Sequence, residues 1–256
     1  TLARNGYFTY ATMRNPEKDA PIKNALKKEN LPIKVIQLGV IDDESLKNAI
    51  DQVTSEAGRI DVLINNAGYG LVGALEELSM EEIKAQYETN LFGLVRVIQA
   101  VLPTMRKQRS GRILNLSSGA GLFGYPGGSA YVSSKFAVEG LSESMAYELE
   151  PFGIRVILIE PGFVQTNFAS SMVIAKKAQD PTSPYSKMMQ RIAASSSELA
   201  KSGSVADLVA NVILDAATNP NPRHRYLVGK DVEAWAASKK SMDESEFFNM
   251  IKKIST

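Results

Sequence analysis

The chain of 256 residues contains no cysteine and a single histidine, His224. Without cysteine there is no disulfide, no thiolate nucleophile and no cysteine-ligated zinc. One histidine excludes a histidine-rich metal site and argues against a histidine-dependent catalytic triad, so we expect no bound metal. No apolar run approaches the roughly 20 residues that cross a bilayer. The formal net charge is only +1, which gives no general attraction for nucleic acid or an acidic membrane surface.

Apolar residues make up 44% of the chain, enough for a substantial core. Short β-branched runs, typical of buried strands, alternate with longer helical patterns. The alternation predicts an α/β fold: one doubly wound domain over residues 1–256, with a parallel sheet and helices on both faces. The expected strands are 7–12, 33–38, 61–65, 113–116, 156–159 and 226–228. The expected helices are 17–29, 42–57, 79–107, 129–152 and 205–217.

Three residues with proton-transfer chemistry follow one another closely in this pattern. Ser118 stands just after an expected strand, and Tyr131 and Lys135 share one face of the next expected helix, four residues apart. A phenol with a pKa of about 10 is a poor acid–base catalyst at neutral pH, and a neighbouring ammonium lowers that pKa. Strand ends that face helix starts are where α/β proteins place their chemistry. The three side chains are therefore predicted to move a proton at a carbonyl or alcohol oxygen.

Five motifs in order resemble those of the short-chain dehydrogenase/reductase family. They are Asn65-Asn66-Ala67-Gly68, Asn90, Ser118, Tyr131 with Lys135, and Pro161-Gly162. The resemblance runs from residue 1 to about residue 230. It implies a Rossmann-type fold, a nicotinamide cofactor and hydride transfer to or from a carbonyl or secondary alcohol.

The resemblance also implies a role for each matching residue. Tyr131 resembles the family's catalytic acid/base, and Lys135 its pKa-lowering partner, which also holds the nicotinamide ribose. Ser118 resembles the hydroxyl that polarises the carbonyl, and Asn90 the amide that holds a relay water. Cofactor contacts are expected from the turn after the third strand and from the nicotinamide turn: Asn65, Ala67, Gly68, Pro161, Gly162, Val164 and Thr166. Thr166 is also interpretable as a helix cap.

Arg14 follows the first expected strand, where this fold places the adenosine ribose. An arginine there accommodates the 2′-phosphate of NADP, whereas an acidic residue selects NAD. We therefore expect NADP(H) in preference to NAD(H), with an ordinary solvated arginine as the alternative. Gly39 departs from the family pattern, which usually has an adenine-contacting aspartate there.

The family's Gly-rich turn, which cradles the cofactor pyrophosphate, is not in this sequence. Residues 1–6 resemble the last turn of the helix that follows that turn. We therefore expect a further strand, turn and most of a helix upstream, roughly 20–25 residues. The missing strand would lie at the middle of the sheet, beside 7–12.

The irregular stretch 163–203 corresponds to the family's variable substrate lid, and 231–256 is expected to form a helical C-terminal extension. An apolar substrate pocket is expected beside Ser118, because apolar side chains gather in this part of the sequence. Its expected members are Phe123, Tyr125, Phe163, Phe168 and Met172. The segment 148–163 resembles the branch acting on steroids, retinoids and similar lipophilic molecules. The family's usual helical interface, 79–107 and 129–152, implies a homodimer or homotetramer, and we expect a cytoplasmic protein.

Two other functions remain open. A dehydratase or epimerase would reuse its cofactor within one cycle, and relatives of that kind carry extra acidic residues near the tyrosine. Val132, Ser133 and Ser134 stand there instead. A cofactor-binding sensor or scaffold without catalysis is the second alternative. Such proteins often lose the tyrosine or the lysine, and this chain keeps both.

Overall fold

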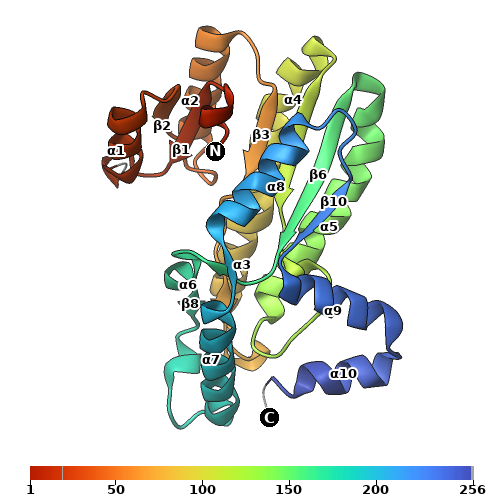
Figure 1. Ribbon diagram of the computed structural model, residues 1–256. Coiled ribbons are helices and arrows are strands. Elements are labelled where there is room, and N and C mark those ends of the chain that lie inside the picture. Colours follow the sequence, from red (N-terminus) through yellow and green to blue (C-terminus); the bar gives the residue numbers. More distant parts are fainter. Residues whose placement is uncertain (19, 255–256) are drawn as a thin grey trace.

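The structure of the protein is a computed structural model that describes residues 1–18 and 20–254. Strands and helices alternate along the chain, as the apolar pattern predicts (Figure 1). The helices are α1 (Ala20–Glu29), α2 (Asp43–Ala57), α3 (Met80–Tyr87), α4 (Gly93–Gln108), α5 (Ser129–Leu149), α6 (Phe168–Ser171), α7 (Ser186–Lys201), α8 (Ala206–Thr218), α9 (Lys230–Ser241) and α10 (Glu244–Lys252).

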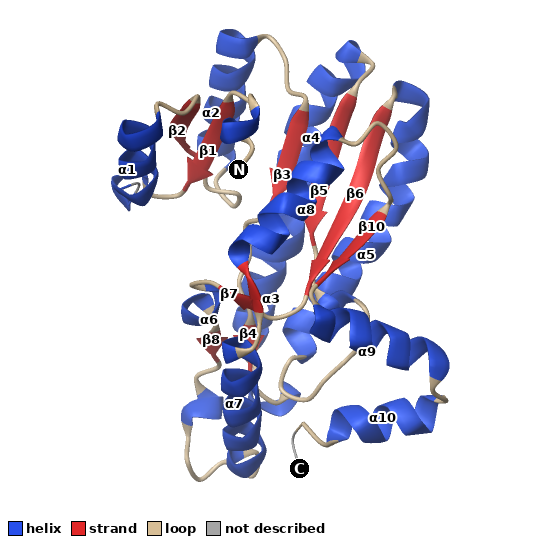
Figure 2. Ribbon diagram, viewed as in Figure 1, coloured by secondary structure: helices blue, strands red, loops and turns tan. Residues whose placement is uncertain are grey.

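The main sheet is parallel and has the strand order β10-β6-β5-β3. A second parallel pair, β1-β2, lies beyond β3 on the side away from β10 (Figure 2). The strands of these sheets are β1 (Thr9–Met13), β2 (Ile33–Gln37), β3 (Val62–Asn65), β5 (Gly111–Leu116), β6 (Ile154–Pro161) and β10 (Arg225–Val228). Two short parallel pairs, β4 (Leu71–Val72) with β8 (Val173–Ile174) and β7 (Val164–Gln165) with β9 (Ser204–Val205), join later segments to the core.

Helices cover both faces of the main sheet, and the alternation of side chains along a strand explains why. Ile113 and Val156 belong to a core cluster with residues of α4 and α5. Their neighbours Leu114 and Ile157 belong to a separate cluster with residues of α8. Because both faces are buried, the strands are almost continuously apolar. The predicted Rossmann-type fold with a doubly wound parallel sheet is confirmed.

The sheet differs from the expected one in its continuity. Among the described residues, β1 pairs only with β2, and β3 pairs only with β5. One edge of each strand therefore has no backbone partner in the described part of the chain. The further strand expected beside 7–12 stays a prediction.

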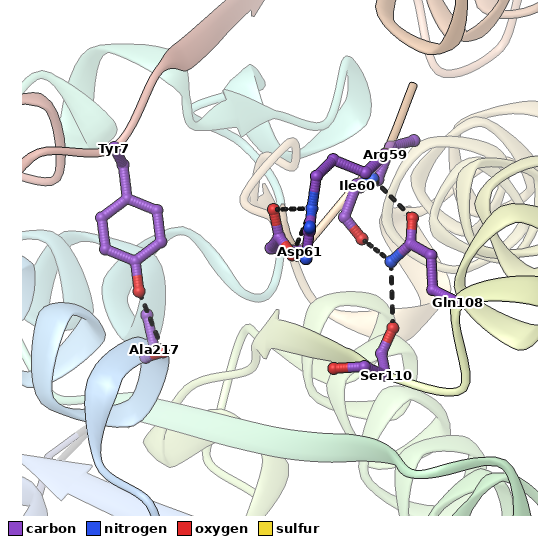
Figure 3. A network of polar contacts seen from close by, with 7 residues as sticks. All are labelled: Tyr7, Arg59, Ile60, Asp61, Gln108, Ser110 and Ala217. Carbon is purple, nitrogen blue, oxygen red and sulfur yellow. Dashed lines mark hydrogen bonds and ion pairs between the residues drawn. The ribbon is translucent and has the colours of Figure 1, made fainter. Parts of the chain in front are cut away.

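Side-chain hydrogen bonds connect the ends of α4 and α8 to the segments that precede the strands (Figure 3). The Gln108 side chain accepts from Ile60 N at 2.8 Å and donates to the carbonyls of Ile60 and Ser110. It thereby joins the end of α4 to the segments that enter β3 and β5. The Tyr7 hydroxyl donates to the carbonyl of Ala217 in α8 at 3.4 Å.

Local signals predicted helix starts well. Asp42 accepts from Ser45 N to cap α2, and Ser79 and Glu82 form a capping box at the start of α3. The expectation of irregular structure through residue 203 was wrong in part, because α7 occupies Ser186–Lys201. The predicted C-terminal helical segment is present as α9 and α10, and residues 255–256 lie outside the described residues.

Candidate active site

The candidate site lies at the carboxyl edge of the main sheet. Ser117 and Ser118 directly follow β5, Pro161 ends β6, and α5 begins at Ser129. Because β5 and β6 are parallel and in register, their carboxyl ends meet at the same edge. This is the edge where open α/β sheets bind ligands.

Tyr131 lies in the first turn of α5, with only 8% of its surface exposed. Burial raises the pKa of its phenol to about 12, and the hydrogen bond with Ser118 acts in the opposite direction. The expected lowering of the Tyr131 pKa by Lys135 is therefore not what the structure shows. The reason is desolvation, which disfavours the phenolate. Tyr131 is a protonated acid in this structure, beside the Ser118 hydroxyl.

Lys135 follows one turn later on the same face of α5, as its spacing predicts. Its Nζ lies 5.8 Å from the centre of the Tyr131 ring and donates to the Leu116 carbonyl at 2.8 Å. Burial lowers the pKa of Lys135 to about 8, while the charge of Glu139 raises it. A lysine with this pKa is mostly charged at pH 7 and loses its proton around pH 8.

Ser118 occupies the cap position of a single turn at Gly119–Gly121. Its Oγ accepts from Ala120 N at 3.2 Å, which fixes the hydroxyl next to the start of that turn. The extended backbone of Ser118 continues the direction of β5. Ser118, Tyr131 and Lys135 are thus brought together by one strand end and one helix start.

Asn90 joins the site from the turn between α3 and α4. Residues Glu88–Phe92 form a π-helical turn there, a feature common at functional sites. The Asn90 side chain is buried, donates to Tyr69 O at 2.9 Å and to Ser134 Oγ at 3.3 Å, and accepts from Tyr69 N at 3.1 Å. Both amide hydrogens are used, so a relay water would have to bind at the remaining lone pair of the carbonyl oxygen.

The residues predicted to contact the nucleotide are divided between two places. Asn65 ends β3 and donates to Asn115 at 2.8 Å, so its side chain has a structural partner. Ala67, two residues further on, is exposed. A Cβ at Gly68 would stand 3.1 Å from Asn90 Oδ1, so glycine permits the close approach of this turn to α3–α4. Arg14 lies exposed after β1, and its guanidinium has no hydrogen bond or ion pair with any described residue.

The turn after β6 is held by a residue that the sequence analysis did not identify. Asp231, in the first turn of α9, accepts from Phe163 N at 2.7 Å. A Cβ at Gly162 would collide with the Asp231 carboxylate in its present position. Val164 continues into β7, and Thr166 Oγ1 accepts from Phe168 N at 3.2 Å. This bond spans two residues, so it forms a local turn just before α6.

The expected pocket residues form two groups. Phe168 lies with its ring 6.2 Å from that of Tyr131, and Met172 approaches the same point, 3.5 Å from a Cβ built on Gly70. Burial, and then Tyr131, raises the pKa of Tyr125 well above its usual value, which places Tyr125 in the same surroundings.

Phe123 and Phe163 instead meet Trp235, which belongs to α9. The ring centres are 5.6 Å apart for Phe123 and Trp235 and 6.2 Å apart for Phe163 and Trp235. Phe123 also packs edge-on against Phe247 of α10. These two residues therefore join the C-terminal helices to the turns around the site, and only the first group borders Tyr131.

An ionic cluster of two buried carboxyl groups and a partly exposed arginine was also missed from sequence. Arg225 at the start of β10 contacts Glu139, one turn beyond Lys135, and Glu160, next to Pro161, with Nη1 to Glu160 Oε1 at 2.8 Å. The spacing of Glu139 from Lys135 is visible in the sequence, but the partners from β6 and β10 are not.

Two further findings concern metal-ligating groups and membrane-spanning helices. In residues 1–18 and 20–254, no group of three or more metal-ligating side chains stands close enough to hold an ion. Within the same residues, no helix is both long and apolar enough to cross a membrane.

The amino-acid sequence is similar to a protein-family model and to several known oxidoreductases. The sequence model described as short chain dehydrogenase matches residues 1–177. An uncharacterised oxidoreductase of Schizosaccharomyces pombe is 36% identical over 92% of this chain and 96% of its own length. The human 17-beta-hydroxysteroid dehydrogenase type 1 is 37% identical over 86% of this chain and 68% of its own length.

Solved structures share the fold over nearly the whole chain. A short-chain dehydrogenase from Streptomyces avermitilis superposes with a TM-score of 0.82 at 29% identity, covering 97% of this chain and 88% of its own. An alcohol dehydrogenase from Thermococcus sibiricus, solved with 5-hydroxy-NADP, gives a TM-score of 0.71 at 27% identity, covering 89% of this chain and 88% of its own.

Proposed function

This chain belongs to the short-chain dehydrogenase family, and on that premise we propose that it is an NADP(H)-dependent oxidoreductase for lipophilic carbonyl compounds or secondary alcohols. The proposal rests on one observation. Tyr131, Ser118 and Lys135 lie together at the carboxyl edge of the sheet, and Tyr131 and Lys135 are buried there. A nicotinamide bound there supplies or accepts the hydride.

The side chains of the chain itself manage the oxygen and its proton. A carbonyl oxygen beside Ser118 and Tyr131 accepts from both hydroxyls, which polarises the carbonyl before reaction. Tyr131 then gives its proton to the oxygen that becomes an alcohol, or takes it back in the opposite direction. The Lys135 ammonium stabilises the phenolate that Tyr131 becomes. Burial excludes water, so each of these interactions is stronger than it would be in solvent.

NADP is proposed over NAD because of the residues near the expected adenosine ribose. Arg14 is exposed and its guanidinium is free of partners among the described residues, at the strand end where this fold places the adenosine ribose. Nothing in the segment 12–15 offers a carboxylate to a ribose hydroxyl. The Thermococcus relative of this fold was solved with an NADP derivative, which supports the same choice.

A lipophilic substrate is supported by the apolar side chains next to Tyr131. Phe168 and Met172 are 41% and 39% exposed, so each keeps apolar surface free beside the phenol. The name of the human relative states that it acts on a hydroxysteroid. The variable segment 163–203, which contributes both residues, is proposed to act as the lid over this surface.

The proposal is tested with purified protein and a panel of carbonyl compounds, following NADPH and NADH absorbance. We expect kcat/KM to rise about fourfold for each CH₂ that the pocket buries, along a series of alkyl ketones of increasing length. NADPH should exceed NADH in kcat/KM with every substrate that reacts. A flat response to chain length, or faster turnover of a small anionic keto acid, would contradict the lipophilic assignment.

A homo-oligomer and a cytoplasmic location remain part of the proposal. Helix α5 exposes Phe136 and Tyr147, and Phe92 is exposed just before α4, which gives this side of the molecule apolar surface for a second copy. Sedimentation should give the mass of a dimer or tetramer, and a monomer at micromolar concentration would contradict it. The cysteine-free composition is compatible with a reducing compartment. Subcellular fractionation tests the location.

A further inference from the structure

Helix α5 continues the line of the active-site residues for one more turn. Tyr131, Lys135 and Glu139 are spaced by four residues, so all three lie along the same face of the helix. Glu139 is nearly fully buried, with a side chain that is only 8% exposed. A buried carboxylate is costly unless it has cationic and hydrogen-bonding partners, so its surroundings need an explanation.

Two of those partners come from neighbouring strands. Glu139 Oε2 pairs with Arg225 at the start of β10, and the same guanidinium nitrogen pairs with Glu160 of β6 at 2.8 Å. One arginine is therefore shared by two buried carboxyl groups. Burial, and then the charge of Glu139, raises the pKa of Glu160 to about 7 against the lowering effect of Arg225. Of the two carboxyl groups, Glu139 is the one on α5, one turn beyond Lys135.

The second oxygen of Glu139 has no such partner. Oε1 is buried and makes no hydrogen bond within the described residues, and neither does the buried Oγ of Ser117. Both atoms lie where a side chain on Gly121 would stand, at 2.9 Å and 2.6 Å from its Cβ position. Because Gly121 has no side chain, it leaves room for Glu139 Oε1 next to the end of β5, which Ser118 follows.

Two other charged side chains lie near this cluster, and each contacts another group. Glu143, on the next turn of α5, contacts Arg225 Nη2 at 3.3 Å but is 61% exposed. Lys239 of α9 donates to the Leu122 carbonyl and faces the Phe136 ring. Lys135 remains as the buried cation one helical turn away, and Glu139 raises its pKa while burial lowers it.

We propose that Glu139 is a positioning residue that keeps the Lys135 ammonium charged in its buried place, while Arg225 and Glu160 hold Glu139 there. This inference rests on the proposed function of Tyr131 and Lys135. A carboxylate one helical turn away offsets part of the desolvation of the ammonium, so more of Lys135 stays protonated at neutral pH. The charged lysine in turn stabilises the phenolate of Tyr131.

Glu139→Gln is the main test, because glutamine keeps the shape and removes the charge. Glu160 then remains as the carboxylate partner of Arg225, so the variant is expected to fold. We expect the alkaline limb of the kcat–pH profile to move down by about one pH unit. The titration of Lys135, followed by NMR of its ζ-nitrogen, should move by the same amount. This second readout requires no turnover, so it separates failure of this inference from failure of the proposed activity.

Two further variants serve as controls. Glu143→Gln removes an exposed carboxylate from the same arginine and the same helix, and it should leave the limb and the titration in place. Glu139→Asp keeps the charge and should retain most of the wild-type profile. The proposal is overturned if Glu139→Gln leaves the Lys135 titration unmoved. It is also overturned if Glu143→Gln or Glu139→Asp moves the titration as far as Glu139→Gln does.

Discussion

We expect the buried ammonium of Lys135 to lower the free energy of unfolding at neutral pH. Burial lowers the pKa of its ammonium from 10.5 to about 8. At about 1.4 kcal/mol for each tenfold change in proton affinity, the charged lysine costs the folded state roughly 3 kcal/mol below pH 8. The native state binds fewer protons than the unfolded state between these two pKa values, so stability rises with pH across that window.

Lys135→Met removes the titrating group and keeps an unbranched side chain. The variant also loses the 2.8 Å hydrogen bond to the Leu116 carbonyl, a loss of about 1–3 kcal/mol that does not depend on pH. The sign of the stability change at a single pH therefore depends on two opposing effects. The variation of that stability change with pH reflects only the titration of Lys135. Relative to wild type, the variant should lose roughly 2 kcal/mol between pH 7.5 and pH 10.

The measurement is urea unfolding of both proteins at several pH values across this range. Lys240→Met, which removes an exposed lysine from α9, controls for the loss of one charge and should give a difference from wild type that is independent of pH. If the difference between Lys135→Met and wild type is also flat from pH 7.5 to 10, Lys135 is not destabilised by burial. The electrostatic account of the site would then be wrong.

Two further substitutions test the cofactor side of the site. Gly162→Ala places a methyl group against the Asp231 carboxylate, so we expect a loss of about 1–3 kcal/mol in stability and weaker NADPH binding, measured by thermal unfolding and fluorescence titration. Wild-type values for both would show that the turn can move aside. Arg14→Ser removes the proposed partner of the 2′-phosphate and should raise KM for NADPH by about 10–100-fold while leaving KM for NADH within twofold. Equal effects on both cofactors would remove Arg14 from cofactor selection.

The parts of the fold that local chemistry decides could be predicted from sequence. The Asp42 cap and the Ser79–Glu82 capping box each involve residues three apart, so the signal is contained in a few letters. Helix α7 was missed because it lacks these signals. No side chain caps its start, and Ile192 is its one buried residue in the described chain.

In the candidate site too, local spacing could be predicted from sequence and long-range contacts could not. The placement of Tyr131 and Lys135 on one helical face followed from their spacing, but their pKa values did not, because burial depends on segments far away in sequence. The ion pairs of Arg225 join residues 65 and 86 positions apart. Phe123 meets Phe247 of the last helix. Contacts of this length leave no local pattern, so only the folded chain reveals them.

Replacement of Tyr131 by phenylalanine is the most direct measurement of the central claim, that this phenol is the acid that protonates the substrate oxygen. Tyr147→Phe, at a 72% exposed position on the same helix, is the matched control. For Tyr131→Phe we predict that kcat falls by about 10²–10⁴-fold, while the Kd for NADPH stays within twofold of wild type. For Tyr147→Phe both values should be unchanged. Turnover by Tyr131→Phe at the wild-type rate, with NADPH bound normally, would contradict the mechanism.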